Sequence, residues 1–68
     1  MAKHEPDVRF HIEKYATWFL CDDKHASKTW WGKFDDAFLC RFDTVEDAQR
    51  AGQVWGGTIR VSVDGELA

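Results

Sequence analysis

The stretch from Phe42 to Gly52 constrains the fold most, because it carries the signals of one amphipathic helix. Thr44 precedes Asp47 by three positions, the spacing at which a hydroxyl caps a free backbone N–H and a carboxylate lies near the positive helix end. Apolar side chains recur every three or four residues, at Val45, Ala48, Ala51 or Gly52, and Trp55. We predict one main helix that ends at Gly52 or at Gly56-Gly57, where glycine tolerates positive φ.

Two other segments alternate apolar and polar residues with the period of a half-buried strand. Val8, Phe10 and Ile12 share one parity near the N-terminus, and Ile59, Val61 and Val63 share one near the C-terminus. The first pattern continues as far as Cys21, interrupted only at Lys14, where we expect a bend or bulge. The polar residues 22–28 suit a turn into a second strand that starts at Thr29.

Residues 34–42 allow two interpretations. They form one long strand, or Phe34 to Leu39 makes a helical turn between two short strands; we favour the second because Asp35-Asp36-Ala37 suits a strand poorly. The predicted fold is α+β: a small antiparallel sheet of three or four strands, in the order ββαβ, with the helix packed on one face. Residues 1–7 are expected to be a flexible tail, residues 8–65 a single domain and residues 66–68 a free end.

Length and charge limit the function classes. A chain of 68 residues forms a single marginal core, although ten aromatic residues give it ample apolar surface. The net charge of −3 comes from residues 22–47, where seven acidic residues face four basic ones, and a general nucleic-acid binder would have the opposite balance. No apolar run reaches membrane-spanning length, so we expect a cytoplasmic protein without a membrane partner.

One helix shields only one face of a sheet, so the other face must be polar or covered by something else. Strand alternation points Tyr15, Phe19 and one of Trp30 and Trp31 away from the helix. The alternative is that residues 34–39 fold over these rings and bury them. We expect an exposed aromatic patch that binds either another protein or a second copy of the chain. The predicted protein-binding residues are the anchors Tyr15, Phe19, Trp30 and Trp31, with Asp22, Asp23, Asp35 and Asp36 steering a partner that has a basic surface.

Other chemistry finds less support. Cys21-x-x-x-His25, with Cys40 elsewhere, lacks the paired spacing of a zinc site, so we predict no metal and no cofactor, and two reduced thiols. A cysteine–histidine nucleophile would also need an orienting group and a pocket, so we predict that the protein is not an enzyme. Trp30 and Trp31 with nearby lysines could stack the bases of a single-stranded nucleic acid, which is one alternative. A structural subunit of a homo-oligomer is another.

The segments Trp30-Trp31-Gly32, Phe34-Asp35-Asp36-Ala37 and Phe42-Asp43-Thr44-Val45-Glu46-Asp47-Ala48 resemble those of small phage and mobile-element proteins. In such proteins a strand hairpin precedes an aromatic "F-x-T-x-E-x-A" helix and a final strand. Some of them are host-takeover inhibitors or anti-CRISPR proteins. The resemblance implies an inhibitor that occludes a bacterial nucleic-acid-processing or defence complex, and it implies no particular functional residue.

Overall fold

The structure is a computed structural model that describes residues 4–68, and the flexible tail predicted for residues 1–7 therefore lies partly outside the described residues. The described part of that segment is irregular and exposed. It touches the domain through the backbone N–H of Asp7, which donates to Asp64 Oδ1 at 3.0 Å.

The main helix forms where the sequence predicts it. Helix α1 spans Val45–Trp55, and the hydroxyl of Thr44 accepts a hydrogen bond from the Asp47 N–H at 3.2 Å. The helix does not stop at Gly52. It ends at Gly56, whose φ is 78° and whose N–H donates to the Gly52 carbonyl at 2.8 Å. The predicted N-cap and the later of the two predicted ends are both confirmed.

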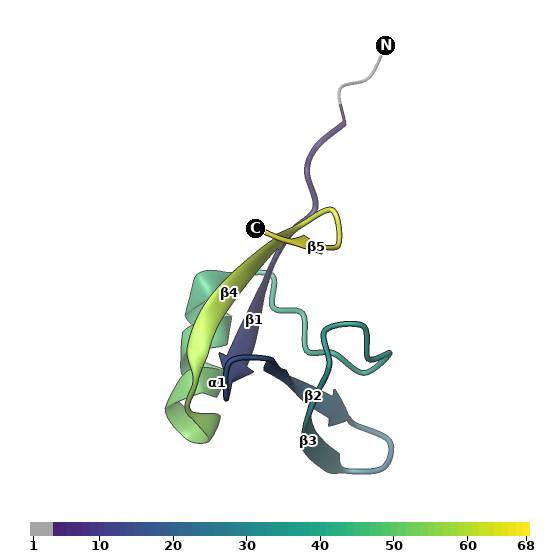
Figure 1. The fold of residues 1–68 in the computed structure, drawn as a ribbon, viewed down its shortest axis with the longest axis vertical. Coiled ribbons are helices and arrows are strands. Elements are labelled where there is room, and N and C mark those ends of the chain that lie inside the picture. The colour runs from purple at the N-terminus through teal and green to yellow at the C-terminus, as the bar shows by residue number, and fades with distance from the viewer. Residues whose placement is uncertain (1–3) are drawn as a thin grey trace.

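The sheet has five strands rather than the predicted three or four. They are β1 (Val8–Lys14), β2 (Trp18–Asp23), β3 (Lys28–Gly32), β4 (Thr58–Val63) and β5 (Glu66–Leu67). All neighbours are antiparallel and the strand order is β3-β2-β1-β4-β5. Figure 1 shows α1 alongside β1 and β4, with the β2–β3 hairpin extending beyond the helix. The α+β class is confirmed, and the predicted order ββαβ is replaced by βββαββ.

The two additional strands arise at turns that alternation does not reveal. Tyr15 and Ala16 adopt positive φ values of 59° and 69°, so the expected long strand folds back into the β1–β2 hairpin, with Lys14 paired to Trp18. Asp64 and Gly65, with φ values of 52° and 85°, reverse the chain into β5. Consecutive positive φ values are typical of hairpin turns, because they match the twist of the two strands that the turn joins. The predicted free C-terminal end is therefore partly a strand, and the sheet extends beyond residue 65 to Leu67.

Residues 33–42 are neither a long strand nor a helical turn. Two successive turns are closed by hydrogen bonds from Asp36 N to Lys33 O and from Leu39 N to Asp36 O. The chain then becomes extended and forms isolated bridges from Leu39 to Cys21 and from Phe42 to Phe10. It thereby fills the wedge between β2 and the first half of β1, which pair directly only near the turn. The favoured interpretation was right about the turn and the short extended piece, but wrong about the helical form.

The core lies on the helix side of the sheet. Ile12, Leu20 and Ala48 are buried at its centre. The side chains packed around them are Phe10, Trp31, Cys40, Phe42, Ala51 and Ile59. Within residues 4–68 no helix is both long and apolar enough to cross a membrane.

Candidate functional site

The sheet face opposite the helix is covered by the chain itself. Phe19 points to this face, as predicted, but it is only 3% exposed. The ring of Phe34 packs edge-on against Phe19, with 5.2 Å between the ring centroids, and against His11, with 5.1 Å between the centroids. The expectation that Phe19 is an exposed anchor is therefore wrong, and the alternative, in which residues 34–39 fold over the rings, is correct for this face.

A buried polar pair lies beneath Phe34. His11 Nε2 is 2.6 Å from Ser62 Oγ, and His11 Nδ1 is 3.0 Å from the Cys40 carbonyl. Because a carbonyl only accepts, Nδ1 carries a proton and donates to it. In the neutral ring, which burial favours, Nε2 then accepts from the Ser62 hydroxyl. Burial lowers the pKa of His11, an effect that its bond to the Cys40 carbonyl opposes. Although a serine hydroxyl bound to a histidine is a nucleophile–base geometry, both side chains are closed to solvent, so this pair anchors the sheet to residues 40–42.

Trp30 and Trp31 point to opposite faces, as strand alternation requires. Trp30 lies on the face opposite the helix, where its indole N–H donates to Asp36 Oδ2 at 3.2 Å and its ring meets Phe38 at 5.7 Å. Trp31 packs against the core on the helix side, and its ring centroid lies 6.4 Å from that of Tyr15. Tyr15 therefore belongs to the helix side and not to the far face that was predicted for it.

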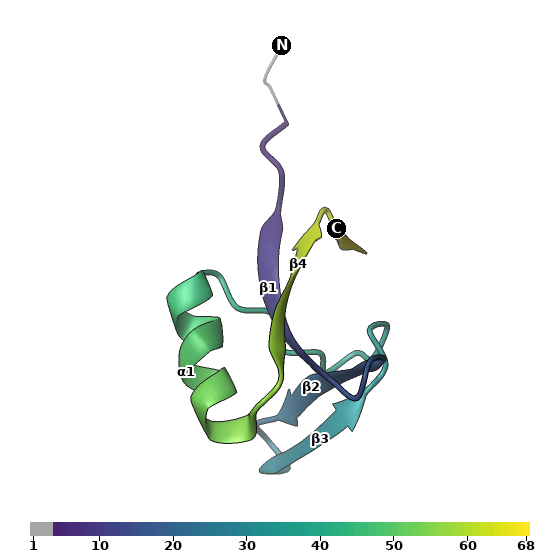
Figure 2. The same ribbon diagram turned by 60° about the vertical axis from the view of Figure 1, so that its left-hand side comes forward.

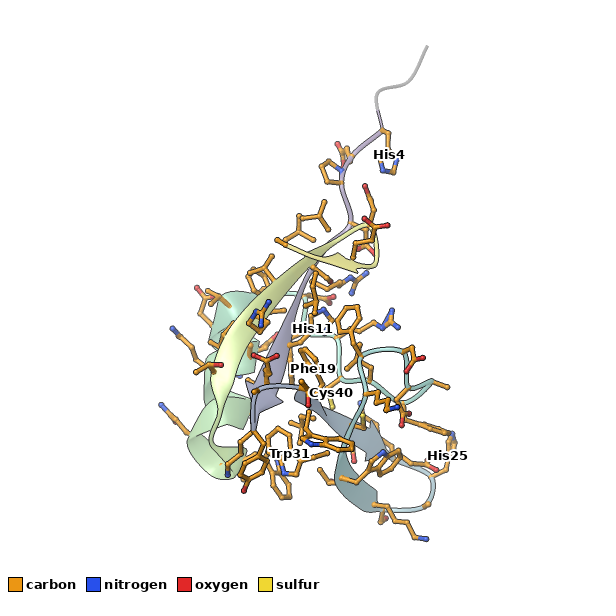
Figure 3. All side chains as sticks on the ribbon, viewed as in Figure 1. His4, His11, Phe19, His25, Trp31 and Cys40 are labelled. Carbon is orange, nitrogen blue, oxygen red and sulfur yellow. The ribbon has the colours of Figure 1, made fainter. Side chains whose placement is uncertain are left out.

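Three of the four aromatic residues that are most exposed lie on the helix side, at the end of the sheet where α1 stops; the fourth, Phe38, packs on Trp30. We call Tyr15, Trp18, Trp31 and Trp55 the aromatic surface. Tyr15 is 69% exposed, Trp18 40% and Trp55 43%. Trp18 joins this side because it pairs with Lys14 across the β1–β2 turn and shares its face. Figure 3 shows Trp31 at this end of the molecule, far from His4.

Lys14 lies at the centre of the aromatic surface. Its ammonium is 5.3 Å from the centre of the Tyr15 ring and 5.5 Å from that of Trp31, both within cation–π range. The same ammonium donates to the Trp55 carbonyl at 3.2 Å, where it compensates a free carbonyl at the helix end. One lysine thus connects the β1–β2 turn, β3 and the end of α1.

Tyr15 occupies a conformation that its residue type does not favour. With φ at 59° it lies in the left-handed region, which costs a residue other than Gly, Asn or Asp about 1–2 kcal/mol. Most of its side chain is nevertheless in solvent, so folding gains little from the ring in return. Ala16, with φ at 69°, shares this strain, so the strain belongs to the turn as a whole.

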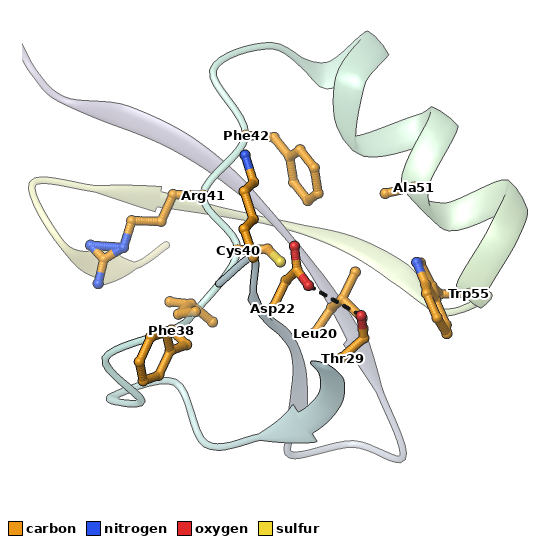
Figure 4. A pocket seen from close by; sticks show the side chains of 11 residues that line it. Leu20, Asp22, Thr29, Phe38, Cys40, Arg41, Phe42, Ala51 and Trp55 are labelled. Carbon is orange, nitrogen blue, oxygen red and sulfur yellow. Dashed lines mark hydrogen bonds between the residues drawn. The ribbon is translucent and has the colours of Figure 1, made fainter. Parts of the chain in front are cut away.

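An open pocket of about 510 Å³ adjoins the aromatic surface and shares Trp55 with it. Figure 4 shows it between α1, the β2–β3 hairpin and residues 38–42. Leu20, Phe42 and Ala51 provide apolar lining, and Lys24, Asp22 and Arg41 provide charge. Asp22 Oδ1 accepts a hydrogen bond from the Thr29 hydroxyl at 3.2 Å, which holds this carboxylate against β3.

The four predicted steering carboxylates do not form one cluster. Asp22 lines the pocket, and Asp23 accepts hydrogen bonds from the His25 and Ala26 N–H groups of the hairpin turn. Asp36 accepts from the Trp30 indole and from the Phe38 N–H, on the far side of the sheet. Asp35 is exposed in the turn beside it. Three of these carboxylates therefore stabilise local structure, and only Asp22 lies near the aromatic surface.

Both cysteines are free thiols. Burial raises the pKa of Cys21, and burial followed by the nearby Asp22 carboxylate raises the pKa of Cys40 to about 11. Among residues 4–68 no three histidine, cysteine or acidic side chains come together in a way that could hold a metal ion. Cys21 is buried whereas His25 is exposed in the hairpin turn, so these two residues do not form a joint site.

Sequence reasoning missed Trp18 and Trp55 as surface residues. It assigned both to inward-facing stripes, and both do lie on the helix side. Each is at the end of its element, Trp18 at the start of β2 and Trp55 at the end of α1, where the covering neighbour stops. A terminal position in a predicted element is the signal that could have identified them.

A scan against protein-family models gives no match for this chain. Comparisons with curated proteins and with solved structures give no match either.

Proposed function

We propose that this protein is a small non-catalytic binding module whose aromatic surface docks onto another protein. The observation that carries the proposal is the exposure of Tyr15, Trp18 and Trp55 around Lys14, on a chain with few residues to spare for its core. Buried tryptophan and tyrosine anchors contribute much of the binding energy at protein interfaces.

The resemblance to phage and mobile-element proteins suggests what such a partner is. On that basis we propose a bacterial nucleic-acid-processing or defence complex that the module occludes without modifying it. Asp22 lines the pocket next to the aromatic surface together with Lys24 and Arg41, and we propose that it pairs with a basic residue of the partner. Rim charges of this kind act mainly on the association rate.

The experiment is affinity capture from the lysate of the natural host, followed by titration of the captured protein. Trp18→Ala is the main variant, because Trp18 is exposed at the start of β2 and its truncation spares the core. We expect it to weaken binding by about thirtyfold, which corresponds to the ~2 kcal/mol of a typical anchor. Val63→Ala is the matched control, since Val63 is similarly exposed, at 38%, at the far end of β4. Equal affinities for the two variants would refute the proposed surface.

Trp31 is a poor choice for this test. It packs against the buried core cluster, so its truncation would lower stability as well as binding. Tyr15→Asn is the better second variant because asparagine tolerates φ near 59°. Weaker binding together with unchanged or higher stability would separate the role of the ring from the role of the turn.

Binding of a single-stranded nucleic acid is the second candidate, and Lys14 among the rings is the observation that favours it. Trp30 and Trp31 cannot form one stacking platform, because they lie on opposite faces. Tyr15, Trp18 and Trp31 are the residues left for stacking on the helix side. Titration with an oligonucleotide at low and high salt tests this candidate, since phosphate contacts weaken steeply with salt.

A further inference from the structure

Strand β3 is an open edge of the sheet, because it pairs only with β2. Its backbone orientation follows from hydrogen bonds on the other side of β2. The Leu20 carbonyl accepts from the Cys40 N–H at 3.0 Å, and the Asp22 N–H donates to the Phe38 carbonyl at 3.0 Å. In an antiparallel strand both backbone groups of one residue point to the same neighbour and alternate along the chain. Leu20 and Asp22 therefore point away from β3.

Thr29 and Trp31 are the residues of β3 whose backbone groups face outward. Leu20 is paired with Trp31 and Asp22 with Thr29, so Thr29 and Trp31 direct their N–H and C=O groups away from β2. No backbone hydrogen bond from another described segment reaches these groups. Figure 2 shows β3 at the end of the sheet, beyond β2. The edge is five residues long and lacks proline, which are features that favour strand addition.

We propose that β3 pairs antiparallel with β3 of a second copy of this chain, about a two-fold axis through Trp30. Only this register uses both outward-facing residues. Thr29 of each copy then lies opposite Trp31 of the other, and each pair exchanges two hydrogen bonds, about four in all. The two Trp30 side chains meet as a non-hydrogen-bonded pair, the position in which facing aromatic residues pack most closely. The sheet becomes continuous across the dimer.

The charges on this edge fit a second copy. In the same register Lys28 of one copy lies opposite Gly32 of the other and on the same face as Trp30. Gly32 has no side chain, and Asp36 Oδ2 lies over it, only 2.9 Å from the place a Cβ would take. Each Lys28 therefore meets a carboxylate that the other copy holds in place through its Trp30 indole and Phe38 N–H. The dimer gains two such ion pairs and brings no two like charges face to face.

The edge shares Trp31 with the aromatic surface but uses the backbone N–H and C=O groups of that residue and not its ring. Loss of partner binding in Trp18→Ala and loss of the dimer are therefore separate outcomes. The first test is hydrogen exchange on the unmodified chain over a series of protein concentrations. We expect the Thr29 and Trp31 amides to exchange quickly in dilute solution and at least tenfold more slowly at high concentration. The Trp30 amide, which bonds to β2, is expected to be protected throughout. Fast exchange at Thr29 and Trp31 at every concentration, together with a monomeric mass by sedimentation, would overturn the proposal.

Charge variants give the second test, with sedimentation equilibrium as the measurement. Lys28→Glu turns two attractions into two repulsions with Asp36, and we expect it to raise the dimer dissociation constant about tenfold. Lys33→Glu is the matched control, because it makes the same change of charge on an exposed residue just beyond β3, outside the proposed strand pairing. Equal effects of the two variants would show that net charge and not this register governs association, and would refute it.

A backbone variant completes the design. Thr29→Pro removes one outward N–H, which an edge strand tolerates, and is expected to abolish the dimer while the circular dichroism spectrum stays native. An intact dimer in this variant would contradict the pairing. If Thr29→Pro unfolds the chain, the Lys28→Glu and Lys33→Glu comparison decides the question.

Discussion

Gly57 offers the sharpest quantitative test of the fold, because it lies in the short connection between α1 and β4 that holds Trp55 next to Lys14. Its φ is +99°, and a Cβ at this position would lie 2.7 Å from the Glu13 carbonyl oxygen and 2.9 Å from Ile12 Cγ2. Real Cβ atoms do not approach backbone oxygens so closely. We therefore expect Gly57→Ala to displace β1 or the start of β4, which are paired at Glu13 and Thr58.

The magnitude follows from comparison with Gly65. That glycine also has a positive φ, +85°, but a Cβ there would meet nothing within 4 Å. Gly65→Ala therefore reports backbone strain alone, with a net cost of about 1 kcal/mol once the lower conformational entropy of the unfolded chain, which favours the variant, has been subtracted. Gly57→Ala adds a clash with backbone and core, about 2 kcal/mol more. A domain of this size has only about 3–5 kcal/mol of stability in total.

The assay is thermal unfolding of both variants, followed by circular dichroism. One kcal/mol corresponds to about 4–8 °C for a domain of this length, so Gly65→Ala should lower Tm by about that amount. Gly57→Ala should lower it at least twice as far or leave the chain largely unfolded. If both variants lose the same amount, the close approach of Gly57 to β1 does not exist and the described position of Trp55 is wrong.

Three further predictions concern the far face and the thiols. Stability should fall as the pH drops below about 6.5, because His11 then binds a proton in the unfolded chain but stays neutral in the folded one, where burial lowers its pKa. In urea titrations at two pH values, His11→Gln should lose most of this pH dependence and His25→Gln should keep it. Cys40, with a pKa of about 11, should react with a disulfide reagent at least tenfold more slowly in the native protein than in denaturant, and equal rates would contradict its burial. Phe34→Ala should cost about 3 kcal/mol in urea unfolding, because it uncovers His11 and Phe19, and a loss below about 1 kcal/mol would mean that Phe34 is not their cover.

Sequence patterns predicted the helix and the strands β1 and β4 because these elements bury one face continuously. The polar residues 22–28 also predicted β3, which begins at Lys28, one residue before the expected start. Thr44 and Gly56 cap α1 as expected, and the alternation around Ile12 and Ile59 identifies the two strands that pack beneath it. The same logic missed the turn at Tyr15 because tyrosine and alanine are not turn residues. A strand break that depends on positive φ at such residues leaves no compositional signal.

The far face could not be assigned from the sequence for a different reason. Phe34 is one of several aromatic residues in an ambiguous segment, and nothing local indicates that it returns over His11 and Phe19. That arrangement depends on contacts between residues more than twenty positions apart, such as the bond from His11 to the Cys40 carbonyl. Local propensity contains no information about contacts between segments that are distant in the sequence. Both interpretations of residues 34–42 were therefore wrong in detail.

The aromatic residues that one helix cannot cover do exist, but they lie on the same side of the sheet as the helix. Helix α1 packs against β1 and β4, and the turn segment with Phe34 covers the opposite face. Neither reaches the helix side of the β2–β3 hairpin, where Trp18 is exposed and Trp31 is only half-buried. A single 11-residue helix placed over two strands of a five-stranded sheet leaves this corner open whatever covers the far face. The lateral offset of α1, rather than the number of sheet faces, is therefore what creates the aromatic surface, and a partner that binds there would occupy the place of a second helix.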